Sequence, residues 1–151
     1  MIERKQLITR TLAKKVAEEA LKKKANDVIL MDLRKLQAPA DFFLVCSADS
    51  DTQVKSIADG VRDGLEQQGV SVWHEEGYQS LQWVLLDYVD VVVHVFHTNI
   101  RRFYNIERLW NDAKVESVED TKKGIRFRKV ERFKRKKAIS STRRARAAGS
   151  V

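Results

Sequence analysis

At 151 residues and 43% hydrophobic content, the chain is long enough for one compact domain with a buried core, and no apolar run approaches the ~20 residues of a membrane-spanning helix. The N-terminal residues lack a signal-peptide pattern, and the single cysteine, Cys46, excludes an internal disulfide, so we expect a protein of a reducing compartment. The net charge of +8 is uneven, because residues 121–151 hold 13 lysines and arginines and one acidic residue, whereas residues 1–120 hold 16 and 20.

Hydrophobic spacing predicts alternating helices and strands over the first 116 residues. In chain order we expect a helix at 3–24, strands at Val28–Leu33 and Asp41–Ser47, a helix at Thr52–Gln68, strands at Val70–His74, Gln82–Leu86 and Val91–Phe96, and a helix at Ile100–Ala113. The last helix is expected to pack through its apolar residues Ile100, Phe103, Tyr104, Leu109 and Trp110. This order predicts a mixed α/β (α+β) domain, with helices packed on a five-stranded mixed sheet. Beyond Val115 the pattern fades, so we expect residues 1–116 to form the domain and residues 117–151 a basic, disordered extension.

The two strands after Leu81 form the most apolar part of the chain. A two-residue turn at Tyr88-Val89, the shortest common hairpin connection, sets three cross-strand pairs: Asp87 with Asp90, Leu85 with Val92, and Trp83 with His94. Because strand side chains alternate, one face is purely aliphatic and is expected to be core: Val84, Leu86, Val91, Val93 and Val95. The other face mixes apolar and ionisable groups: Trp83, Leu85, Asp87, Asp90, Val92, His94 and Phe96. This mixed face is either a second, partly covered side of the sheet or a surface for a partner.

No pattern of catalytic or metal-binding residues is found. The six glycines are dispersed, so no phosphate-binding loop is present, and Cys46, His74, His94 and His97 do not form a recognisable metal set. Asp87 and Asp90 form a carboxylate pair near a strand end, but neither a third acid nor a phosphate loop accompanies them. We therefore predict no catalytic residue, metal or cofactor.

Several motifs resemble those of a known family. The matching segments occur in family order from about Ala40 to Trp110: ADFFLVCS, the helix with VKSIAD, EGY, WVLLDYVDVVVHVF and RRFYNIERLW. The chain thus resembles the ribosomal silencing factors, also called Iojap-like proteins. Two positions depart from the family pattern, because Ala48-Asp49 stands where Gly and then Thr or Asn are usual, and Val89 stands where the hairpin turn usually has Gly.

The resemblance implies a non-enzymatic, cytoplasmic translation factor with a nucleotidyltransferase-like fold that lacks the catalytic residues. Members bind the large ribosomal subunit through its ribosomal protein L-fourteen and block joining of the small subunit, which represses translation. Organellar relatives act in large-subunit assembly, so an assembly factor remains an alternative. A nucleotide-dependent transferase and a dimerisation module, with a homodimer off the ribosome, are further alternatives.

On this basis we expect two contact regions. The ribosomal-protein contact is expected on the hairpin and the loop before it, at Trp83, Leu85, Asp87, Tyr88, His94 and Tyr78, because aromatic anchors dominate many interfaces. The basic extension is expected to bind rRNA phosphates through Lys134, Arg135, Lys136, Lys137, Arg143 and Arg144. A solvated tail without a target is the alternative for the second region.

Overall fold

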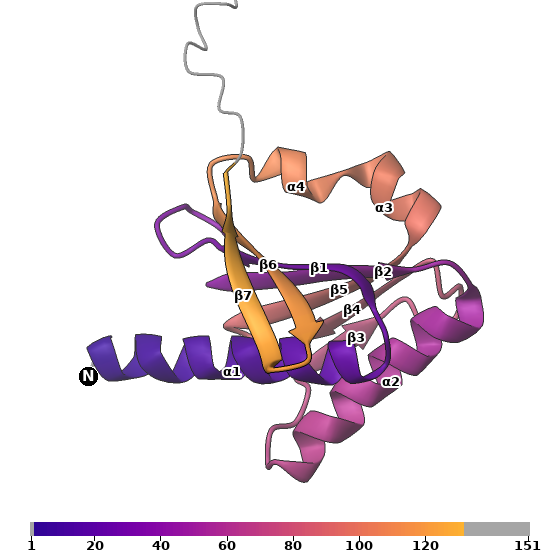
Figure 1. Ribbon diagram of the computed structural model, residues 1–151, viewed down its shortest axis with the longest axis horizontal. Helices are drawn as coiled ribbons and strands as arrows, with labels where there is room; N and C mark the ends of the chain where they lie inside the picture. The colour runs from indigo at the N-terminus through magenta and orange to yellow at the C-terminus, as the bar shows by residue number, and fades with distance from the viewer. Residues whose placement is uncertain (1, 132–151) are drawn as a thin grey trace, which may run out of the picture.

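The computed structural model describes residues 2–131, which form a single sheet with helices on both of its faces (Figure 1). The elements are α1 (Ile2–Lys22), β1 (Asn26–Asp32), β2 (Phe42–Ala48), α2 (Asp51–Gln67), β3 (His74–Glu76), β4 (Trp83–Asp87), β5 (Val91–His97), α3 (Thr98–Tyr104), α4 (Ile106–Leu109), β6 (Lys114–Thr121) and β7 (Gly124–Val130). Helices α1 and α2 cover one face of the sheet, while α3 and α4 lie over the other (Figure 1). The predicted rRNA contacts of the tail, from Lys134 to Arg144, lie outside the described residues.

The sheet is mixed, as expected, but it has seven strands and not five. Their order is β3-β4-β5-β2-β1-β6-β7, and the β2–β5 pair is parallel while the other pairs are antiparallel. Of the two additional strands, β7 and residues 117–121 of β6 occupy positions that were assigned to a disordered extension. Half-buried Ile125 and Phe127 alternate with exposed Arg126 and Arg128, which is the pattern of an edge strand with one buried face. The proposed boundary after residue 116 therefore cuts through β6.

Two apolar cores lie on the two sides of the sheet. The larger core joins α1 and α2 to the sheet and contains the five residues of the aliphatic hairpin face. The smaller core, between the sheet and α3–α4, contains Phe43, Val45, Val92, Phe96 and Ile106. Strand β2 contributes to both cores and is buried along its whole length, as its continuous apolar run predicts. The mixed hairpin face is therefore largely a second, covered side of the sheet.

The register of the β4–β5 hairpin differs from the predicted one. Leu85 lies opposite His94 and Asp87 lies opposite Val92, so the turn is at Val89-Asp90. Because this shift is two residues, an even number, every side chain keeps its predicted face. Val89 has a φ of +74°, and Asp90 N–H donates to Tyr88 C=O at 2.9 Å, which closes a γ-turn of the strained, positive-φ form.

Two other elements also differ from prediction. The strand expected at Val70–His74 forms instead at His74–Glu76. The single helix expected at Ile100–Ala113 is divided into α3 and α4 at Asn105, which adopts a left-handed conformation with a φ of +46°. Asparagine tolerates this conformation better than most residues, so it can end one helix and begin the next. In the described part of the chain, no helix is long and apolar enough to cross a membrane.

Candidate protein-binding surface

Three large apolar side chains of the α3–α4 layer are exposed. Phe103 is 77% exposed, Tyr104 53% and Leu109 74%, although the sequence predicted all three as packing residues. We call them the α3–α4 patch. Large apolar side chains that stay in water within one layer of a fold commonly mark an interaction site.

The sequence carried a signal for this exposure. On one continuous helix, with about 100° per residue, Leu109 would point away from Ile100, so no single stripe could bury all the apolar residues. The break at Asn105 does not remove this conflict, because the short helix α4 buries Ile106 and leaves Leu109 in water.

The base of the patch is held by polar contacts. The largely buried Arg101 guanidinium donates to Asp27 C=O at 2.8 Å and to Ser47 Oγ at 3.0 Å, and it pairs with Glu107 at 2.9 Å. Thr98 Oγ1 donates to Ala48 C=O at 3.0 Å. These contacts fix α3 and α4 to the ends of β1 and β2, so the patch is presented in a set orientation.

Trp83 extends the patch toward the sheet. Its ring lies 5.1 Å from that of Tyr104, which in turn meets Phe103 edge-on at 5.0 Å. On its inner side the half-buried indole stacks on Phe96 at 4.7 Å. Ring separations of this size suit favourable aromatic pairs. The result is a column of aromatic rings that runs from the core, through Trp83, to the exposed Phe103.

His94 supports Trp83 from below and is only 5% exposed. Trp83 Nε1–H donates to His94 Nδ1 at 3.1 Å, which requires a neutral imidazole with its proton on Nε2. Burial lowers the pKa of His94 to about 3, so the ring stays neutral at physiological pH. His94 therefore orients Trp83 and does not itself reach the surface.

The remaining predicted contact residues fall on both sides of the sheet. Leu85 and Asp87 share the face of Trp83, and the Asp87 carboxylate accepts the N–H of Val89 at 2.7 Å in the turn. Tyr88 is 7% exposed in the larger core, and burial raises its pKa to about 12. Tyr78 also packs against that core, with the Arg62 guanidinium 5.3 Å above its ring. The structure thus groups Trp83, Leu85 and His94 and separates both tyrosines from them.

Among the side chains of residues 8–131, no three His, Cys, Asp or Glu groups converge on one point. Asp87 is engaged in the turn through its side chain, and Asp90 through its backbone carbonyl, which accepts from Asp41 N–H and Phe42 N–H. Both residues therefore stabilise the hairpin.

Comparison with protein families matches residues 6–148 to the family described as "Ribosomal silencing factor during starvation". The chain belongs to this family. The ribosomal silencing factor RsfS of Bacillus subtilis (strain 168) is 41% identical over 97 residues, which span 64% of this chain and 82% of that protein. The chloroplastic protein Iojap of Zea mays is 34% identical over 103 residues, which span 68% of this chain and 45% of that protein.

Solved structures of relatives agree with the fold. A crystal structure from Chromobacterium violaceum superposes with a TM-score of 0.66 at 37% identity, over 68% of this chain and 85% of that one. A Bacillus halodurans structure gives a TM-score of 0.61 at 38% identity, over 67% and 94%. The family resemblance seen in the sequence is thus confirmed, and it identifies the chain as one of a group of regulatory proteins, the ribosomal silencing factors.

Proposed function

We propose that this protein binds the large ribosomal subunit through ribosomal protein L-fourteen, and that the bound domain blocks the approach of the small subunit. The observation that carries the proposal is the α3–α4 patch, which places exposed aromatic side chains on a base fixed by Arg101 and Thr98. Such preorganised aromatic residues supply most of the affinity in many protein interfaces. Inhibition then requires only occupied space, with no chemical step.

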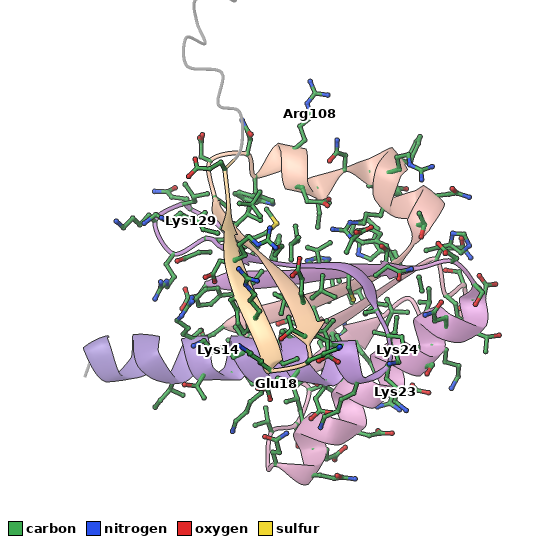
Figure 2. The ribbon with its side chains drawn as sticks, in the orientation of Figure 1. Lys14, Glu18, Lys23, Lys24, Arg108 and Lys129 are labelled. Atoms are coloured by element: carbon green, nitrogen blue, oxygen red, sulfur yellow. The ribbon has the colours of Figure 1, made fainter. Side chains whose placement is uncertain are left out.

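The proposed contact set follows from position. Phe103, Tyr104 and Leu109 touch the partner first, while Trp83 and Leu85 form the floor beside them. His94 acts beneath Trp83, whereas Tyr78 and Tyr88 pack in the larger core on the other face of the sheet and are not part of the proposed contact. The exposed guanidinium groups of Arg102 and Arg108 lie on the same two helices and supply a charged rim; Figure 2 shows Arg108 extending outward from α4.

The sharpest test is Phe103→Ala, because this side chain is 77% exposed and its loss should leave stability within about 0.5 kcal/mol of wild type. Truncating an interface anchor commonly costs about 2 kcal/mol or more, which is about a 30-fold rise in Kd for L-fourteen. Calorimetry with purified L-fourteen and co-sedimentation with large subunits would measure it. Trp83→Ala is a weaker probe, since it also removes the stacking on Phe96 and the bond to His94.

Trp73→Ala is the matched control. Trp73 is 71% exposed, but it precedes β3 at the opposite edge of the sheet from β7, outside the α3–α4 layer. We expect unchanged affinity for this variant. Wild-type affinity in Phe103→Ala, or an equal loss in both variants, would refute the assignment of the patch.

The remaining details of function are proposed on the same basis. A cytoplasmic protein without catalytic activity, built on a nucleotidyltransferase-like fold, is consistent with the family. An assembly factor would bind the same subunit, but its removal would leave incompletely assembled large subunits, whereas removal of a silencing factor would raise the fraction of joined ribosomes. Gradient sedimentation of ribosomes from cells lacking the protein distinguishes these outcomes, and light scattering tests for a homodimer off the ribosome.

A further inference from the structure

Charge is divided between the two edges of the sheet. Residues 49–112, which include α2 and the strands at the β3 edge, hold 11 acidic and 5 basic residues. At the opposite edge, the tip of the β6–β7 hairpin and strand β7 carry five exposed cations, which we call the hairpin strip: Lys122, Lys123, Arg126, Arg128 and Lys129. Figure 2 shows Lys129 on β7, the outermost strand.

The strip follows the geometry of an extended edge strand. Lys122 and Lys123 form the tip, and Arg126 and Arg128 lie on the same face of β7, where residues two apart are roughly 7 Å from each other. Lys129 points to the other face by the same alternation. The strip therefore runs from the tip along β7, with Arg126 and Arg128 on one face of the strand and Lys129 on the other.

The acidic residues of the hairpin neutralise this strip only in part. Glu116 is engaged by Arg10 at 3.0 Å, and Asp120 lies opposite Ile125, on the side of the hairpin that faces α1. Glu119 pairs with Arg128 at 3.5 Å, with both side chains well exposed. Among the side chains that the structure describes, those of residues 8–131, Lys122, Lys123, Arg126 and Lys129 form no ion pair, so these four cations can meet an external anion.

The composition of the strip favours nucleic acid over protein. Among the described residues, none of the exposed large hydrophobic side chains lies on the β6–β7 hairpin, so the strip lacks the apolar anchors on which protein interfaces depend. After Glu131, which follows β7 directly, the sequence continues the same charge, because residues 132–151 hold eight lysines and arginines and no acidic residue. A row of exposed cations without apolar anchors is suited to a phosphate backbone.

We infer that the hairpin strip binds the sugar–phosphate backbone of RNA, without base specificity. The inference rests on the proposed function in one respect: the RNA is taken to be rRNA, because a protein bound to the large subunit is surrounded by rRNA. The strip lies at the β7 edge, whereas the α3–α4 patch lies over β2 and β5. One bound domain can therefore contact a ribosomal protein and neighbouring rRNA at the same time.

The test compares two full-length variants of equal net charge. Lys122→Gln/Arg126→Gln removes two cations of the strip, and Lys24→Gln/Lys55→Gln removes two exposed cations from the turn after α1 and from α2. Binding to a labelled single-stranded RNA oligonucleotide is followed by fluorescence anisotropy over a range of salt. Each phosphate contact with single-stranded nucleic acid contributes about 0.7 to the slope of log K against log salt, so the strip variant should lose about 1.4 and the control should lose nothing.

Three results would overturn the inference: an unchanged slope in the strip variant, an equal loss in the control, or binding of polyglutamate as tight as that of RNA. Light scattering on the same samples adds a fourth, since a dimer lost only in the strip variant would assign this edge to a second copy of the chain. Affinity for isolated L-fourteen should be the same in all proteins. If wild type fails to bind L-fourteen while the RNA slope falls as expected, the proposed function is wrong and the strip stands.

Discussion

Replacement of Val89 by glycine should stabilise the protein. Val89 occupies a φ of +74°, a region that costs an L-residue with a Cβ about 1–2 kcal/mol. Glycine removes this strain but loses about 0.5–1 kcal/mol through the greater freedom of the unfolded chain. Because the valine side chain is 56% exposed, little apolar burial is lost. The balance predicts a gain of about 1 kcal/mol for Val89→Gly.

Urea and thermal unfolding measure this gain. For a chain of this size, about 1 kcal/mol corresponds to a rise in Tm of about 4 °C. Val89→Ala is the matched control, since alanine keeps the Cβ and therefore most of the strain, and its stability should stay near that of wild type. A less stable Val89→Gly protein would refute the reasoning. Equal gains in both variants would show that the branched side chain, and not the backbone angle, is responsible.

Two further substitutions test the supports of the site and the core. The pKa of His94 is about 3 when folded and about 6.5 when unfolded, so the unfolded state binds the extra proton between these values and stability falls as the pH drops through this window. His94→Phe should reduce the pH dependence of the free energy of unfolding by up to about 1.4 kcal/mol per pH unit. Urea melts at pH 5 and 7 measure this dependence, and an equal change in unfolding free energy between the two pH values in both proteins would contradict the prediction. An alanine Cβ at Gly64 would overlap the nearly buried carboxylate of Glu19, so Gly64→Ala should cost about 1–2 kcal/mol, because overpacking outweighs the gain in helix propensity. Gly60→Ala meets only the flexible Lys23 side chain at 2.7 Å and should be neutral or stabilising, so Tm values in the reverse order would reject the packing explanation.

The elements predicted correctly are those with strong, local signals. Helix α2 has a single apolar stripe, a Ser50 cap that accepts from Gln53 N–H, and a glycine after its end. Strand β2 is apolar throughout because it is buried on both faces. The division of the β4–β5 hairpin into two faces was predicted correctly although the predicted register was wrong. The register error was two residues, and strand side chains return to the same face every two residues.

The elements that were missed depend on contacts distant in sequence. Strand β6 pairs with β1, more than 80 positions earlier, and β7 is stabilised through β6. Their charged residues resemble those of a disordered segment until the pairing is known. The patch was missed for a related reason, since whether Phe103 and Leu109 are covered depends on how α3 and α4 are placed over the sheet, which local spacing does not determine.

The two surfaces differ in the physics of their binding, and this has a consequence for the whole complex. The α3–α4 patch is apolar, so its affinity depends little on salt, whereas phosphate contacts weaken steeply as salt rises. When both surfaces lie on one rigid domain, the first contact raises the effective concentration of the second, and the two affinities combine. Isolated L-fourteen would engage only the patch. The affinity for a whole large subunit should therefore be higher than for L-fourteen alone and should fall more steeply with salt, and the difference between the two salt slopes is the share that rRNA contributes.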